Sequence, residues 1–369
     1  MATHDEIMET PFATVHPTEI IKDELKARGL SQRELAARME MQPSNLSRFL
    51  KGENITPAIA AKLEMALDIP AEIWLNMQAQ YEKDLKAITL RDEQERAAIN
   101  AEKMLSNILN LPELFKRLSI SSSLYVQSRL ATLENLLGFP ALEVSKQPFA
   151  LQVCYKKSEK YEVEERNQMT WLTLAFIASK NKPNYPFVDG NALKAALEIA
   201  KGIHKGHFEE SDIRQILNEN GIAYNVVRKL EKTPIDAVAM QMEGYPAIIT
   251  THRYDDMSRL VFNVLHELGH IHLHMCKELI PVFISSDESY SINNKEEKEA
   301  NRFAEDMLID REVWKKMMST KVSSLSSVII IRKLRELSEM NGLDFNIVAW
   351  RYRYESHNYN LSIKPVHIV

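Results

Sequence analysis

The chain has 369 residues, more than one hydrophobic core usually organises, so we expect two or three domains of about 100–200 residues each. Its composition is that of a soluble globular protein, with 45% hydrophobic residues, 26% charged residues and a formal net charge of -5. The first ten residues lack the basic start and apolar run of a signal peptide, and no segment approaches the roughly 20 apolar residues that span a bilayer. These features exclude an integral membrane protein and predict a cytoplasmic one.

The two cysteines, Cys154 and Cys276, lie far apart and match neither a disulfide framework nor a Cys-x-x-Cys metal site. We therefore expect both thiols to be reduced. Any metal site in this chain has to be built from histidine and carboxylate side chains.

Residues 16 to 80 contain four groups of apolar residues at helical spacing, separated by residues typical of helix ends. Gly29-Leu30-Ser31 ends the first helix and caps the second, while Gln42-Pro43 and Thr56-Pro57 start the third and the fourth. The pattern predicts a compact, all-helical domain over residues 1 to 81.

Two consecutive helices of this domain have the form of a helix-turn-helix, with SQRELA from residue 31 and PSNLSRFLKG from residue 43. Base edges and phosphates would be contacted by polar side chains of this motif. For base edges these are Gln42, Ser44, Asn45 and Arg48, and for phosphates Gln32 and Lys51. At least as many carboxylates offset the basic residues of the domain, whereas DNA affinity rests on phosphate neutralisation, so a purely protein-binding module stays an alternative.

Residues 16 to about 81 resemble the HigA-type antitoxins of the Xre helix-turn-helix class. The resemblance lies in the segments HPTEIIKDELKARGLSQRELAARM and DIPAEIWLNMQAQYE. It implies that the domain binds operator DNA as a homodimer, and it raises a toxin as a possible partner.

Residues 82 to 148 stay helix-rich and charged, which predicts a helical connector, with an oligomerising coiled-coil arm as the alternative. A further domain is expected from residue 149 to residue 369. It begins with a strand-like run at residues 151–155, followed by helices near 169–178, 190–201 and 211–220.

Three short β-like runs then lead directly into another helix, which predicts an α+β domain with a small sheet. The runs are at residues 224–227, 237–241 and 247–250. The chain as a whole is thus expected to be mainly α-helical with one small β-sheet.

The helix after the third run carries His266-Glu267-Leu268-Gly269-His270. Residues four apart point the same way on a helix, so the two histidines can bind one metal ion while Glu267 reaches a water on it. Zinc in a catalytic site needs a third protein ligand and one open position.

A second amphipathic helix, from residue 296 to 304, supplies acidic candidates for that ligand. Glu297 shares a face with Ala300 and Ala304, whose small side chains would let the two helices approach, whereas Glu299 aligns with charged residues and reads as solvated. We therefore choose Glu297 as the third ligand, with Asn301 placed one turn later to hydrogen-bond a ligand histidine. The alternative is that these glutamates only solvate the helix.

Two further histidines, His272 and His274, follow the motif, but neither is at the helical offset that would join the first pair. We expect both to be structural or surface residues.

Residues 250 to 309 resemble the ImmA/IrrE family of metallopeptidases, in the pattern HELGHIHLH followed by EKEANRFAEDMLI. The resemblance implies that His266, His270 and Glu297 bind Zn²⁺ and that Glu267 is catalytic. One departure is Ile309-Asp310, where the family often has an apolar residue and proline, but this lies beyond the ligands.

In such a site zinc lowers the pKa of its water to about 7, and Glu267 takes the proton and delivers it to the leaving amine. A second oxyanion donor is expected, and the sequence does not choose among its candidates. These are Tyr352, Tyr354, His357 and His252.

Two hypotheses follow for the whole chain. The first is a DNA-binding regulator with a zinc endopeptidase domain that cleaves a regulatory protein, such as a repressor, an antitoxin or a toxin. The second is an antitoxin or repressor whose peptidase-like domain senses a signal or binds a partner without proteolysis. The intact Glu267 favours the first, because a pure binding domain needs no general base.

Overall fold

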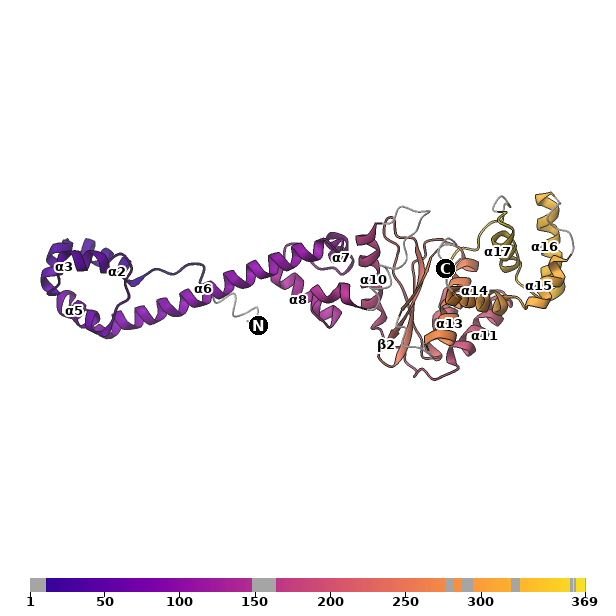
Figure 1. Cartoon of the computed structure of the whole chain (residues 1–369), viewed down its shortest axis with the longest axis horizontal. Coiled ribbons are helices and arrows are strands. Elements are labelled where there is room, and N and C mark those ends of the chain that lie inside the picture. Colours follow the sequence, from indigo (N-terminus) through magenta and orange to yellow (C-terminus); the bar gives the residue numbers. More distant parts are fainter. Residues whose placement is uncertain are drawn as a thin grey trace. The chain divides into compact units, whose positions relative to one another are not determined.

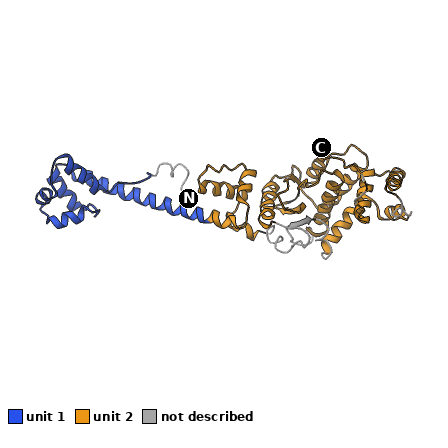
Figure 2. Ribbon diagram, turned by 90° about the horizontal axis from the view of Figure 1, so that it is seen from above, with its two compact units in different colours: residues 1–100 blue, residues 101–369 orange. Residues whose placement is uncertain are grey.

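The computed structural model describes residues 11–147, 164–275, 282–286, 295–319, 326–358, 361 and 363–368. The strand expected at residues 151–155 and both cysteines lie outside the described residues. The chain divides into two compact units, Met1–Asn100 and Ala101–Val369 (Figure 2). Among the helices that the structure describes, none combines the length and the apolar character needed to cross a membrane.

The first unit is all-helical (Figure 1). Its second, third and fourth short helices begin where the sequence predicts, directly after Ser31, Gln42 and Thr56. The side chains of His16, Ser31 and Thr56 accept hydrogen bonds from backbone N–H groups of the first turns, which have no partner within the helix. The helices are α2 (Pro17–Ala27), α3 (Gln32–Arg38), α4 (Pro43–Phe49), α5 (Pro57–Leu67) and the long α6 (Ala71–Ser106).

One apolar cluster holds these helices together, with Ile21, Leu35, Leu46, Leu63 and Trp74 almost fully buried in it. The predicted helix-turn-helix is formed by α3 and α4, which contact each other. The boundary expected at residue 81 falls inside α6, which continues unbroken past it, and the boundary expected at residue 148 lies outside the described residues.

The second unit begins with short helices and a 3-10 turn, followed by an α+β body. Its sheet has four strands in the order β1-β3-β2-β4, with β1 parallel to β3 and the other neighbours antiparallel. The three predicted strands are present, and β4 is an additional strand that the sequence pattern did not indicate. The strands are β1 (Ala223–Val226), β2 (Ile235–Met242), β3 (Tyr245–Thr250) and β4 (Val282–Ser286).

The two inner strands, β2 and β3, are buried on both faces, as expected for a sheet covered by helices on each side. A tight turn joins them, and Gly244 at φ 85° supplies the left-handed conformation that this turn requires. Helix α10 (Glu165–Ser179) packs on one face of the sheet and α13 (Met257–His270) on the other (Figure 1). The expected α+β architecture is therefore confirmed.

Helix α13 is the centre of the second unit, because it contacts the sheet as well as several of the surrounding helices. Its neighbours include α11 (Asn191–Ile203), α14 (Lys295–Leu308) and α17 (Phe345–Ser356). The remaining helices are α7 (Leu111–Arg117), α8 (Val126–Leu137), α12 (Glu210–Glu219), α15 (Arg311–Met318) and α16 (Ser327–Asn341), with a 3-10 turn at Ala141–Lys146 and a π-turn at Ile271–Met275.

Candidate metal centre

Helix α13 places the HELGH motif in its last turn, deep inside the second unit. Asp256 caps the helix by accepting a hydrogen bond from the backbone N–H of Ser258 at 2.9 Å. Val261, Val264 and Leu268 are fully buried in the apolar core, which fixes the rotation of the helix about its axis. The motif side chains therefore have defined directions.

Helix α14 approaches α13 closely at Gly269. A Cβ atom built on this glycine would lie 3.1 Å from Phe303 Cδ1 and 3.2 Å from the Cα atom of Ala300. Ala300 and Ala304, on the facing side of α14, are both fully buried. The small residues on both helices let the two backbones come into contact. This contact places Glu297 and Asn301 of α14 beside the histidines of α13.

Three donor atoms converge at this contact, from His266, His270 and Glu297. The two imidazole Nε2 atoms are 3.0 Å apart, and Glu297 places Oε2 3.3 Å from His266 Nε2 and Oε1 3.6 Å from His270 Nε2. Neighbouring ligands around a tetrahedral zinc ion, with bonds of about 2.0–2.1 Å, are separated by about 3.3 Å. The donor set therefore has the size and the chemistry of a three-residue zinc site.

Asn301 supports the first histidine. Its Oδ1 atom lies 2.8 Å from His266 Nδ1, so the ring donates its Nδ1 proton to the amide oxygen. That tautomer leaves the lone pair on Nε2, the atom that faces His270 and Glu297. The arrangement is what a ligand histidine requires.

His274 lies outside the three-residue cluster, as expected of a structural histidine, but the expectation that it is off the face of the metal pair is wrong. Its Nδ1 atom lies 3.1 Å from His270 Nδ1, and its Nε2 atom is 3.1 Å from Glu299 Oε2. The signal was available, because His274 follows His270 by four residues. Glu299, expected to be only solvated, is 44% exposed and yet bonded to a nearly buried imidazole.

The two histidines of the cluster differ in their electrostatics. Burial lowers the pKa of His270 to about 3, so this imidazole is neutral and can offer a lone pair. Burial alone would also lower the pKa of His266, but the hydrogen bond to Glu297 and the charges of Glu267 and Glu297 outweigh it and raise that pKa. The carboxylates thus surround a position suited to a cation.

Glu267 lies next to His266 in the sequence and is fully buried. Four residues are candidate oxyanion donors. Tyr352 is buried in the core, and the Nε2 atom of His252 lies 3.4 Å from Glu210 Oε2. His357 ends α17 in a left-handed conformation. Tyr354 packs against Phe262, whose ring centroid is 6.0 Å from that of Tyr354 and 6.3 Å from that of His266.

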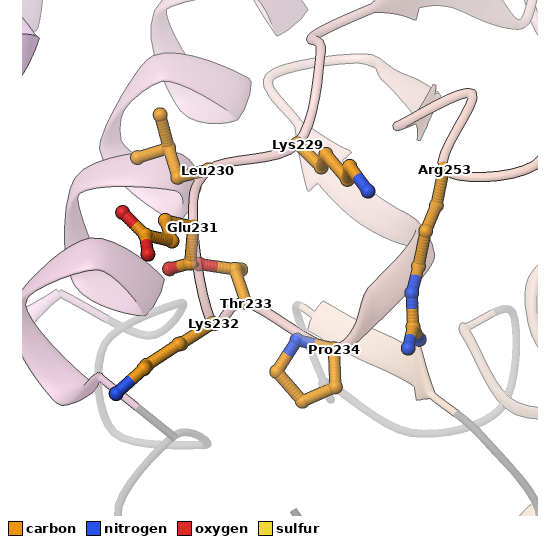
Figure 3. A pocket seen from close by; sticks show the side chains of 7 residues that line it. All are labelled: Lys229, Leu230, Glu231, Lys232, Thr233, Pro234 and Arg253. Atoms are coloured by element: carbon orange, nitrogen blue, oxygen red, sulfur yellow. The ribbon is translucent and has the colours of Figure 1, made fainter. Parts of the chain in front are cut away.

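A separate hollow of about 550 Å³ opens beside the loop between β1 and β2 (Figure 3). In Figure 3 the side chains of Lys229 and Arg253 face each other across it, on either side of Pro234. It shares no residue with the cluster of His266, His270 and Glu297. Its lining consists of Lys229, Leu230, Glu231, Lys232, Thr233, Pro234 and Arg253.

In the first unit, the side chains predicted to contact DNA are all exposed. They are Gln32, Gln42, Ser44, Asn45, Arg48 and Lys51. Arg48 forms a 2.8 Å ion pair with Glu53, and both partners are largely exposed, so the pair is worth little and can open toward a phosphate or a base.

The approach of α14 yields a prediction. We expect Gly269→Ala to push the helices apart by a few tenths of an ångström, because the backbone of Ala300 leaves no room for a methyl group. Zinc affinity, measured by chelator competition, should fall at least about tenfold, as for lost ligand support. Gly244→Ala, strained at its turn but with open space around it, should lower stability and leave zinc affinity unchanged. Equal zinc affinity in the two variants would contradict this account.

Comparison with known proteins agrees with this division of the chain. Residues 21–74 match the helix-turn-helix family, and residues 226–349 match the IrrE N-terminal-like domain of peptidase family M78. An uncharacterized HTH-type transcriptional regulator of Escherichia coli (strain K12), YddM, is 37% identical over 81 residues, which cover 20% of this chain and 86% of that regulator. The chain therefore belongs, through its first unit, to the family of HTH-type transcriptional regulators, and it carries an IrrE N-terminal-like peptidase domain in its second unit.

Proposed function

We propose that this transcriptional regulator is also a zinc-dependent endopeptidase, and that it hydrolyses peptide bonds in a regulatory protein. The observation that carries the proposal is the convergence of two imidazoles and one carboxylate, next to Glu267 in the sequence. The Nε2 atoms of His266 and His270 are 3.0 Å apart, and the two oxygens of Glu297 lie 3.3 Å and 3.6 Å from them. Three protein ligands leave one position of a tetrahedral ion for water, which is the catalytic rather than the structural pattern.

The chemistry divides between the ion and the chain. A bound zinc ion would lower the pKa of a coordinated water and polarise the peptide carbonyl. Glu267 would accept the proton of the attacking water and then deliver it to the leaving amine. His266 and His270 would hold the ion as neutral imidazoles. Among the candidate donors for the carbonyl oxygen we choose Tyr354, because its ring packs against Phe262, the neighbour of His266.

The attached DNA-binding unit favours a regulatory protein as the substrate, because a peptidase that degrades small peptides would not need to bind operator DNA. The substrate would be a repressor, an antitoxin or a toxin that acts on the same operon. The HigA-like segments of the first unit support an antitoxin-type regulator that binds its operator as a homodimer in the cytoplasm. The alternative, a sensor that binds without cleaving, leaves Glu267 without a role.

Operator binding is supported by the six exposed polar side chains of the helix-turn-helix. Arg48 is the one able to form a bidentate contact with a guanine edge, and Lys51 and Gln32 would contact phosphates. Charge on this unit is mixed, so we expect shape and base contacts to contribute strongly to affinity.

The first prediction from this proposal separates the metal from the chemistry. Glu267→Gln should retain one zinc per chain, measured by elemental analysis, because Glu267 is not a ligand. The substrate to test is the protein encoded by the neighbouring gene, and mass spectrometry detects its fragments. Its cleavage rate should fall by about 10²–10⁴-fold in Glu267→Gln. His266→Ala should lose both the zinc and the cleavage. If the zinc-loaded protein cleaves neither that partner nor itself, and its biological output survives Glu267→Gln, the sensor hypothesis is correct.

The second prediction concerns DNA. The binding free energies of a duplex from the protein's own promoter and of a random duplex are compared. Arg48→Ala should reduce the difference between them by about 1–3 kcal/mol and should also weaken binding to the promoter duplex. Glu53→Ala removes the ion-pair partner of Arg48 and should leave discrimination intact. Equal binding of promoter and random duplex by the unaltered protein would instead identify the unit as a protein-binding module.

A further inference from the structure

We propose that His274 and Glu299 are positioning residues for the metal ligand His270, and that they hold its ring through a relay of two hydrogen bonds. The inference rests on the proposed metal site and extends it to two residues outside the ligand set. One residue belongs to the π-turn after α13 and the other to α14.

The distances define the direction of each hydrogen bond once His270 is a ligand. Its Nε2 atom faces His266 and Glu297, so the lone pair is there and the proton is on Nδ1. That proton is then donated to His274 Nδ1, which lies 3.1 Å away. His274 then carries its own proton on Nε2, which it donates to Glu299 Oε2, also at 3.1 Å.

The end of the relay is suited to this role. The relay ends on a carboxylate oxygen, Glu299 Oε2, which accepts the hydrogen bond from His274 Nε2. Lys295 lies 3.6 Å from the other carboxylate oxygen and orients it from the solvent side. An anionic acceptor fixes the tautomer of His274, and through it the tautomer of His270.

With this relay, both ligand histidines are held by α14. Asn301 accepts from His266 Nδ1 directly, and Glu299 holds His270 through His274. The same helix supplies the third ligand, Glu297. A short stretch of α14 therefore provides the ligand Glu297 and the two residues, Glu299 and Asn301, that hold the histidines. Metal affinity then depends on the position of α14 along α13.

The test is a zinc titration of the full chain against a competing chelator, without any substrate. His274→Ala and Glu299→Ala should each weaken zinc binding by about 10–100-fold. Asp306→Ala removes a carboxylate from the same helix, one that lies 3.7 Å from Arg302 Nε and outside the metal cluster, and it should have no effect on zinc binding. The melting temperature of the metal-free protein should change little for Glu299→Ala, because that side chain is half-exposed.

A conservative variant distinguishes positioning from packing or long-range charge. In His274→Asn the amide oxygen can occupy the place of Nδ1 and accept from His270, so zinc affinity should recover most of the loss seen in His274→Ala. Glu299→Ala should then have no further effect in the His274→Asn background, because the relay to Glu299 is already broken. A Glu299 effect of unchanged size in that background would show simple charge attraction and overturn the relay.

The outcomes separate this inference from the proposed function. Zinc binding that is unaltered in His274→Ala and Glu299→Ala overturns the relay alone and leaves the peptidase proposal standing. No zinc binding by the unaltered protein overturns both. Normal zinc binding with no proteolysis contradicts only the peptidase proposal, and the relay is still judged by the affinities of its variants.

Discussion

The backbone contact between α13 and α14 at Gly269 and Ala300 determines everything else in the second unit's polar centre. Two helices whose backbones approach this closely leave no space for side chains at the contact itself. The polar side chains that flank the contact, one residue after it and about one turn before it on each helix, are therefore brought together. On α13 these are His266 and His270, and on α14 they are Glu297 and Asn301.

The contact places several polar side chains where little solvent reaches them. His266, His270, Glu267 and Glu297 are all buried to 4% exposure or less, and polar groups in such surroundings are costly unless they are hydrogen-bonded or paired with charge. Asn301, His274 and Glu299 meet part of that need from the outside. A divalent cation bound between His266, His270 and Glu297 would compensate the remaining polar atoms. Metal binding and the stability of this region are therefore coupled.

Sequence periodicity predicted most of the fold because most elements have one clear signal. Examples are the helix starts at Ser31 and Thr56 and the three β-like runs that form β1, β2 and β3, since caps and apolar runs are local features. Strand β4 was missed because its five residues, Val282–Ser286, gain their strand conformation from pairing with β2 far earlier in the chain. Periodicity on α14 also selected Glu297 over Glu299, and the structure brings the former into the cluster. It could not show that Glu299 reaches a histidine from the other helix.

The central claim is that one helix pair builds a zinc site from two imidazoles and one carboxylate. X-ray absorption spectroscopy at the zinc edge, on full-length protein loaded with one equivalent of zinc, tests it most directly. The account predicts four-coordinate zinc with two imidazole ligands and oxygen donors, at about 2.0–2.2 Å. A third imidazole, which would make His274 a ligand, or a sulfur neighbour at about 2.3 Å would contradict it.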